Sequence, residues 1–206
     1  MAEVAAIILA AGQSSRFEPG REETKLIALL HGKPLVRHVA EAAMASRARP
    51  IIVVTGHAAG KVEAALAPLD LTFVFNPAYA TGLASSLQAG IAALPETAAG
   101  AVILLADMPS ISAGLIDRLI QAFGESAQPP SAVVPVRGKL RGNPALIGRK
   151  LFDALKRFDG DRGARAVIDA AGKDVVECLV DDPAIEIDID TPEALRRLSM
   201  VRQPGR

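Results

Sequence analysis

The sequence predicts an α/β protein, a three-layer α/β/α domain with a mostly parallel, twisted sheet. Short aliphatic runs alternate along the chain with segments of helical periodicity, which is typical of parallel strands covered by helices on both faces. Half of the 206 residues are hydrophobic while only 3% are aromatic, and buried parallel strands are aliphatic in this way. A chain of this length is expected to form a single domain with a substantial core.

The first half of the chain shows the alternation most clearly. Most of its strands end at glycine, asparagine or aspartate, and the helices carry apolar residues three and four positions apart. The expected strands are Val4–Leu9, Pro50–Thr55, Leu71–Phe75, Ala101–Leu105 and Ala132–Val136. The expected helices are Pro34–Ala48, Gly60–Ala67, Leu83–Leu94 and Ala113–Phe123.

The second half is less regular. Its expected strands are Pro144–Ile147, Val175–Leu179 and Ile185–Ile189, and its expected helices are Arg149–Phe158, Ala164–Ala171 and Pro192–Leu198. No repeat or flexible linker divides the chain. We therefore expect one domain over residues 1–199 and a disordered tail over residues 200–206.

The charge balance excludes several classes of partner. Lys and Arg together number 23, as do Asp and Glu, so there is no basic footprint for nucleic acid or for an acidic membrane surface. Met1-Ala2-Glu3 lacks the basic start of a secretory signal, and Val4–Ala11 is too short to span a bilayer. The sequence predicts a cytoplasmic protein with small-molecule substrates.

The loop after the first strand has the composition of an anion-binding site. The strand ends in residues that are mostly small and let the backbone approach a ligand: Leu9, Ala10, Ala11 and Gly12. Gly12 tolerates backbone angles that other residues avoid. Arg16 offers a fork of donors that suits phosphate, and Lys25 offers a mobile charge. An ordinary turn with solvated basic residues is the alternative interpretation.

Two acidic positions are candidates for a metal site. Asp107 is a lone carboxylate at the end of an aliphatic strand, and it either binds a cation such as Mg²⁺ or caps the following turn. Period-two alternation places Glu186, Asp188 and Asp190 on one face of the strand expected there. Three such carboxylates repel unless they are solvated or share a cation, although Asp190 or Thr191 could also cap the following helix.

These motifs together resemble the nucleotidyltransferases of Rossmann-like fold, specifically the molybdenum cofactor cytidylyltransferases. The resemblance rests on Leu-Ala-Ala-Gly-x-Ser-x-Arg from Leu9, Asp-Met-Pro from Asp107 and Asp-Thr-Pro-Glu from Asp190. It also rests on Asn-Pro-x-x-x-x-Gly-x-x-x-Ser-Leu from Asn76. One departure is the longer, acidic stretch over Glu18–Thr24, which makes the alignment of Lys25 less direct than that of Arg16.

The resemblance implies a role for each motif. Arg16, Lys25 and Asp107 would be catalytic, and Asp107 and Asp190 would hold Mg²⁺, or Mn²⁺ in its place, with Asp188 as second choice. The nucleotide would also contact residues at the end of the first strand and at the start of the third expected helix. These are Leu9, Ala10, Ala11, Gly12, Gly82 and Ser86. Serine capping of the helix alone is the alternative for Ser86.

Two glycine-rich segments of the second half resemble the family's acceptor side. The acceptor-binding residues implied there are Arg141, Asn143, Asp161, Arg162 and Arg165. Solvated loops are the alternative. Residues 1–110 would then form the NTP-binding half and residues 111–199 the acceptor-binding half.

The resemblance therefore predicts an Mg²⁺-dependent transferase that joins CMP from CTP to molybdopterin and releases pyrophosphate. A molybdoenzyme or its chaperone would be a further partner. One rival keeps the reaction but uses GTP with the same acceptor, or a sugar or alditol phosphate as the acceptor. A rival of another class is a non-catalytic carrier of the cofactor or of a nucleotide, which would not need two carboxylates for a metal-bridged triphosphate.

Overall fold

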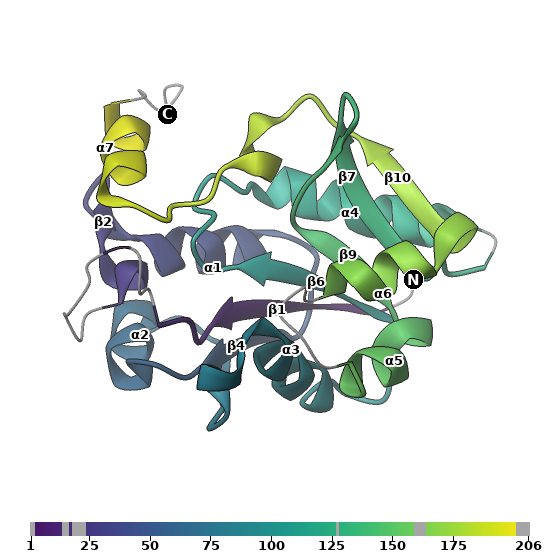
Figure 1. The fold of residues 1–206 in the computed structure, drawn as a ribbon, viewed down its shortest axis with the longest axis horizontal. Helices are drawn as coiled ribbons and strands as arrows, with labels where there is room; N and C mark the ends of the chain where they lie inside the picture. The colour runs from purple at the N-terminus through teal and green to yellow at the C-terminus, as the bar shows by residue number, and fades with distance from the viewer. Residues whose placement is uncertain (1–2, 14–16, 18–23, 127, 159–163, 201–206) are drawn as a thin grey trace.

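The computed structural model describes residues 3–13, 17, 24–126, 128–158 and 164–200. A central sheet lies between two layers of helices (Figure 1). The strand order in the main sheet is β10-β7-β9-β6-β1-β4-β5, and β8 pairs with β7 off this path. The strands are β1 (Val4–Ala10), β4 (Ile51–Thr55), β5 (Thr72–Phe75), β6 (Gly100–Leu105), β7 (Ala132–Arg137), β8 (Leu140–Arg141), β9 (Ala145–Gly148) and β10 (Val175–Leu179). The predicted fold class is confirmed.

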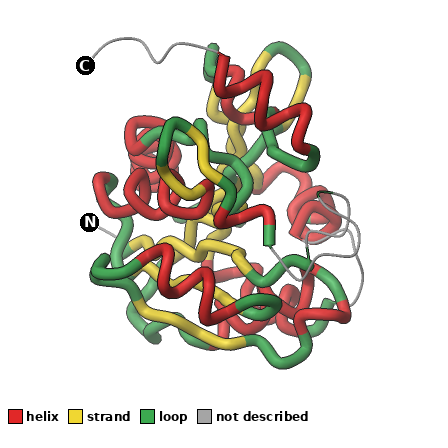
Figure 2. Tube along the Cα trace, turned by 90° about the vertical axis from the view of Figure 1, so that its left-hand side faces the viewer, coloured by secondary structure: helices red, strands yellow, loops and turns green. Residues whose placement is uncertain are grey.

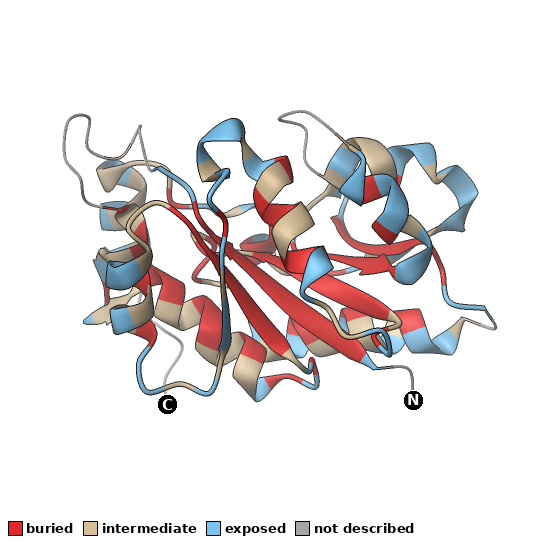
Figure 3. Ribbon diagram, turned by 90° about the horizontal axis from the view of Figure 1, so that it is seen from below, coloured by how far each residue is buried: buried red, intermediate tan, exposed pale blue. Residues whose placement is uncertain are grey.

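Strand β1 lies at the centre of the sheet and is buried along its whole length (Figure 3). It runs parallel to β4, with Ile7 opposite Ile52, and parallel to β6, with Ile7 opposite Ile103. The chain passes from β1 through β4 to β5 on one side and then returns to place β6 on the other side. In open parallel sheets, ligands bind in the crevice at such a reversal, beyond the carboxyl ends of the strands.

Two layers of helices cover the sheet, and each layer buries its own apolar cluster (Figures 1 and 2). One layer consists of α1 (Leu35–Ala45), α2 (Ala59–Leu66) and α4 (Ala113–Glu125). The other consists of α3 (Leu83–Ala92), α5 (Phe152–Lys156) and α6 (Ala164–Ala170). Helix α3 lies so close to β1 that a Cβ atom at Gly90 would meet Cγ2 of Ile7 at 2.5 Å. Within the described part of the chain, no helix combines the length and apolar character needed to cross a bilayer.

The sheet is mixed because β9 runs antiparallel between β6 and β7. The flanking strands β6 and β7 still point the same way, so their carboxyl ends share the edge used by β1 and β4. The helix predicted over Arg149–Phe158 is a 3-10 turn (Arg149–Leu151) followed by the single short turn of α5.

The strand predicted over Ile185–Ile189 is wrong. A 3-10 turn over Pro183–Glu186 occupies its beginning, where proline stands at the first position and the Asp182 side chain accepts a hydrogen bond from the Ala184 backbone. Proline and an aspartate cap favour a helical turn over a sheet ladder. The chain then runs extended past Asp107, whose carbonyl accepts a 2.9 Å hydrogen bond from the Ile189 backbone.

The C-terminal helix α7 (Pro192–Met200) packs on a short hairpin formed by β2 (Leu29–Leu30) and β3 (Lys33–Pro34). Pro34 belongs to this hairpin, so α1 begins one residue later than predicted and ends at Ala45. Met200, assigned from the sequence to a tail, is the last residue of α7, and residues 201–206 lie outside the described chain. The remaining 3-10 turns are Lys25–Ile27, Tyr79–Thr81 and Gly172–Asp174.

Candidate functional site

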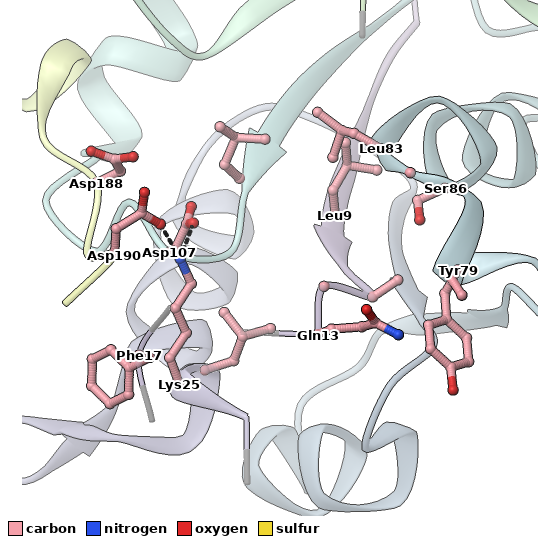
Figure 4. A pocket seen from close by; sticks show the side chains of 16 residues that line it. Leu9, Gln13, Phe17, Lys25, Tyr79, Leu83, Ser86, Asp107, Asp188 and Asp190 are labelled. Carbon is pink, nitrogen blue, oxygen red and sulfur yellow. Dashed lines mark hydrogen bonds and ion pairs between the residues drawn. The ribbon is translucent and has the colours of Figure 1, made fainter. Parts of the chain in front are cut away.

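The main pocket has a volume of about 670 Å³ and opens beyond the carboxyl ends of β1 and β6. Its two ends differ in chemistry (Figure 4). Carboxylates and a lysine gather at one end, and uncharged polar side chains lie at the other. The lining residues are Leu9, Ala11, Gly12, Gln13, Phe17, Lys25, Leu26, Tyr79, Ala80, Gly82, Leu83, Ser86, Leu105, Asp107, Asp188 and Asp190.

Asp107 stands two residues after β6, where a backbone hydrogen bond from Ala106 to Leu9 holds the chain beside β1. Its Oδ2 atom accepts a 2.8 Å hydrogen bond from Lys25 Nζ. Its Oδ1 atom is buried and has no hydrogen-bond partner among the described residues. An unsatisfied buried carboxylate oxygen is costly. A cation or hydrogen-bond donor that enters the pocket would supply the partner that this oxygen lacks.

Lys25 lies between two carboxylates that come from distant parts of the chain. Its Nζ atom is 2.8 Å from Asp107 and 2.6 Å from Asp190, and its side chain is only 12% exposed. Burial alone would lower the pKa of the Lys25 ammonium, but the carboxylates of Asp107 and Asp190 outweigh it and raise the pKa. The lysine is therefore a cation at neutral pH, held where two anions converge.

The three acidic residues near the C-terminus do not share one face, because they do not lie on a strand. Glu186 turns away from the pocket and pairs with Arg137. Asp188 is exposed at the pocket rim, and Asp190 reaches Lys25 (Figure 4). The following helix is capped by Thr191, whose hydroxyl accepts from the Ala194 backbone. Asp190 is therefore not needed as the cap, and its carboxylate serves the acidic end of the pocket.

The glycine loop lines the floor of the pocket, with two corrections to the sequence prediction. Ala10 is fully buried in the core and does not line the pocket, whereas Leu9, Ala11 and Gly12 do. Gly12 does not adopt a left-handed angle, and a Cβ atom added there would meet no atom of the described residues within 4 Å. Glycine at this position therefore keeps space open for a ligand, and the backbone conformation does not require it. Arg16 lies outside the described residues.

The polar end of the pocket is built by the turn after β5 and the start of α3. Gly82 has φ +118° and precedes α3, and no side chain caps that helix. Ser86 is 4% exposed, lines the pocket and accepts a 3.1 Å hydrogen bond from Asn76 Nδ2. Neither Ser86 nor its neighbour Ser85 caps the helix. Ser85 instead donates to the carbonyls of Ala78 and Gly82.

Several pocket residues were not singled out from the sequence, and three of them carry large polar or aromatic side chains. Gln13 and Tyr79 lie at the polar end, away from Lys25, and Phe17 lies beside the lysine (Figure 4). Gln13 falls at a variable position of the glycine-loop motif. Tyr79 is the chain's single tyrosine and lies inside the Asn76 motif, which is the signal that could have identified it.

A second pocket of about 220 Å³ adjoins the first and shares Leu9, Leu83 and Leu105 with it. Its remaining lining is aliphatic at the floor and polar at the mouth: Leu87, Ile103, Val134, Arg141, Gly142, Asn143, Ala145, Ala164, Arg165, Ile168 and Asp169. The structure therefore brings together three of the predicted acceptor residues. Asp161 and Arg162 lie outside the described residues.

Arg141 and Arg165 differ in how far their charge is already satisfied. Arg141 donates to Glu177 at 2.8 Å and to Asp169 at 3.0 Å. Arg165 is exposed on α6, and no described residue pairs with it. At the mouth of the second pocket, Arg165 is consequently better placed than Arg141 to meet an anion.

The described residues limit what could hold a metal. Among them, no group of three or more His, Cys, Asp or Glu side chains is arranged to bind an ion. Asp107 and Asp190 can supply two carboxylates at most, which is the usual protein share for Mg²⁺ when substrate phosphates and water complete the shell.

Gly12→Ala should weaken nucleotide binding without lowering the stability of the fold. The added methyl group meets no described atom within 4 Å and opposes no left-handed angle. We therefore expect the free energy of unfolding to stay equal or to rise by about 0.4–1 kcal/mol. The same methyl group would obstruct a phosphate on the loop, and we expect the dissociation constant for an NTP to rise about tenfold. Thermal unfolding and calorimetric titration would measure the two effects. A fall in stability without any change in affinity would contradict this account of Gly12.

The fold and the site define a doubly wound α/β protein with an acid–lysine cluster at the strand reversal. Residues 6–175 match the MobA-like NTP transferase domain. The chain belongs to this family.

Individual relatives are similar to this chain over different shares of their own length. The bifunctional protein GlmU of Francisella philomiragia is 34% identical over 152 residues, covering 73% of this chain and 31% of that protein. The chain thus spans about a third of the length of the GlmU relatives it matches. The nicotine blue oxidoreductase of Paenarthrobacter nicotinovorans is 28% identical over 201 residues, covering 95% of this chain and 96% of that protein.

Solved structures give the same fold. Rv0371c of Mycobacterium tuberculosis H37Rv superposes with a TM-score of 0.84 at 25% identity, covering 98% of this chain and 100% of that chain. A complex of Rv0371c with manganese superposes with a TM-score of 0.79 at 24% identity over 95% of this chain and 97% of that chain, and it supports the fold alone.

Proposed function

We propose that this chain is an Mg²⁺-dependent cytidylyltransferase that transfers CMP from CTP to the phosphate of a molybdopterin-like acceptor. The observation that carries the proposal is the acid–lysine cluster at the strand reversal. There, a buried Asp107 oxygen lacks any described partner while Asp190 and Lys25 lie within hydrogen-bond distance of one another. Family membership supports the same reaction class.

The residues present fit a divalent cation. Asp107 and Asp190 would hold Mg²⁺, with Mn²⁺ as a substitute, and the orphaned Oδ1 atom of Asp107 would gain the partner that it lacks. When bound, such a cation neutralises charge that develops on the triphosphate during transfer. Lys25 occupies the space between these carboxylates. It would have to move aside, and its ammonium would then be available to the phosphates.

The two pockets would hold different substrates, the nucleotide in the main pocket and the acceptor in the smaller one. The loop over Leu9–Gly12 would cradle the triphosphate, and Gly82 and Ser86 would border the base. The smaller pocket, with Arg165 and Asn143 at its mouth, would take the acceptor, whose phosphate oxygen attacks the α-phosphorus as the bond to pyrophosphate breaks. The phosphate is already ionised near neutral pH, so no protein nucleophile or strong base is required.

The choice of CTP and of the acceptor rests on narrower observations. Ala11 lines the main pocket. Guanylyltransferases of the family usually have Ala-Gly-Gly where this chain has Ala10-Ala11-Gly12, and the additional methyl group of Ala11 favours cytosine, the smaller base. The aliphatic floor of the second pocket favours a flat ring over a sugar or alditol phosphate, whose hydroxyls would need more partners. We place the reaction in the cytoplasm and assign delivery of the product to a molybdoenzyme or its chaperone.

The direct test is pyrophosphate release with each of the four NTPs, with and without molybdopterin, in Mg²⁺. We expect turnover only with the acceptor, a preference for CTP of at least about tenfold, loss of activity in EDTA and recovery with Mn²⁺. A preference for GTP would overturn the base assignment. Turnover only with sugar or alditol phosphates would overturn the acceptor, and binding of CTP and acceptor without pyrophosphate release would favour a carrier.

A further inference from the structure

Asn76 is a buried polar residue to which the proposed function assigns no role. It follows β5, and its backbone N–H continues the pairing with β4 by donating to the Thr55 carbonyl at 2.8 Å. The side chain is 3% exposed and does not line either pocket. A buried amide that touches no ligand directly must act through the groups to which it bonds.

The orientation of the Asn76 amide is fixed by its neighbours. Its Oδ1 atom accepts a 2.9 Å hydrogen bond from the Ala78 backbone N–H, a group that can only donate. The amide nitrogen must therefore face the start of α3, where it lies 2.9 Å from Ser85 Oγ and 3.1 Å from Ser86 Oγ. The reverse orientation would place two donors against each other at Ala78.

The two serines that receive these hydrogen bonds differ in where their own protons go. Ser85 donates to the carbonyls of Ala78 and Gly82 at 3.0 and 2.9 Å, and it does not line the pocket. Ser86 lines the polar end of the main pocket, and no described group accepts a hydrogen bond from its hydroxyl. The hydrogen bond from Asn76 occupies one lone pair of Ser86 and keeps the Ser86 proton from turning toward residue 76, which leaves that proton available to the pocket.

We infer that Asn76 is a positioning residue that fixes the Ser86 hydroxyl as a hydrogen-bond donor to the nucleobase. This inference rests on the proposed function, in which the base occupies that end of the pocket. A fixed donor selects a base that presents an acceptor atom there. The O2 and N3 atoms of cytosine are acceptors on its pairing edge, so a donor at Ser86 is compatible with CTP. Asn76 thereby links the end of β5 to base recognition without touching the base.

A double-mutant cycle between Asn76 and Ser86 tests this inference. Asn76→Asp keeps the oxygen that accepts from Ala78 but cannot donate to Ser86, so the serine would turn its proton toward residue 76. We expect N76D and S86A each to raise KM for CTP about tenfold with kcat changed less than about threefold, as for the loss of one hydrogen bond. In the S86A background, N76D should add less than about twofold, because the interaction is already lost.

Ser85→Ala is the matched control, since it removes the other serine bonded to the same amide. We expect its KM to change less than about threefold. Independent, multiplicative effects of N76D and S86A, or an S85A effect as large as that of S86A, would overturn the inference and leave Asn76 with a purely structural role. If N76D fails to fold, an S85A effect as large as that of S86A would still overturn the inference.

A failure of the inference about Asn76 can be distinguished from a failure of the proposed function. Calorimetric titration with CTP and Mg²⁺ should show the same pattern of dissociation constants as KM, whether or not molybdopterin is the acceptor. If wild-type protein neither binds nor turns over CTP, the proposed function fails before the cycle is read. If wild type binds CTP but the cycle is additive, only the role of Asn76 fails.

Discussion

An Asp107→Asn variant is expected to lose about 10³-fold in kcat/KM for pyrophosphate release from CTP while remaining folded. The amide cannot supply the negative charge that a divalent cation requires, and losing such a preorganised electrostatic contact typically reduces rates by about 10²–10³ or more. Stability should change little, because the amide oxygen can still accept a hydrogen bond from Lys25 and Asp190 still pairs with that lysine. Steady-state kinetics and thermal unfolding in EDTA would measure both effects.

Neighbouring acidic residues provide the controls for this variant. Asp190→Asn should have an effect of similar size, whereas Asp188→Asn, on an exposed rim residue, should cost less than about tenfold. Glu186→Gln, whose partner is Arg137 outside the pocket, should leave kinetics near wild type. Pyrophosphate release retained by D107N would refute the metal assignment, and a larger loss in D188N than in D190N would move the second ligand to Asp188.

Replacing Lys25 by methionine should have opposite effects on metal and on nucleotide. In the absence of nucleotide, the lysine competes with a cation for Asp107 and Asp190, through contacts of 2.8 and 2.6 Å. Hydrogen bonds between charged groups contribute about 1.5–3 kcal/mol, so removing this competitor should tighten Mn²⁺ binding about tenfold or more. With CTP, however, the lost phosphate contact should lower kcat/KM about 10²-fold.

Mn²⁺ affinity can be read from the electron paramagnetic resonance signal of the free ion, without any reaction. K25M should also have a lower melting temperature in EDTA than wild type, and Mn²⁺ should raise it more than in wild type, because two carboxylates are left without their lysine. Lys61→Met, an exposed lysine on α2, is the control and should bind Mn²⁺ like wild type. Weaker Mn²⁺ binding by K25M than by wild type would show that Lys25 supports the metal site and does not compete for it.

Local patterns in the sequence were sufficient to predict the architecture. The aliphatic run of β1 and the helical periodicity of α4 both appear in the structure close to their predicted bounds. These predictions succeed because alternation and period depend on residues near one another in the chain. The strand predicted over Ile185–Ile189 fails because Pro183 and Asp182 form a turn, so local turn chemistry overrides an alternating pattern.

The candidate site was only partly predictable for the same reason. Asp107 and Gly12 could be singled out because each follows a strand, and strand ends share one edge of a parallel sheet. The pairing of Arg141 with Glu177 and Asp169 could not be foreseen. It joins β8, β10 and α6, and it leaves Arg165 as the more available cation at the second pocket.

The sequence by itself determined the mostly parallel sheet, the edge at which we expect ligands to bind and the residue types present there. Only the tertiary structure decided which of them meet. Lys25 contacts Asp107 across 82 positions and Asp190 across 165, and Asn76 reaches Ser86 through the turn that begins α3. Contacts over such separations depend on how helices pack on the sheet and how loops close, which hydrophobic periodicity does not encode.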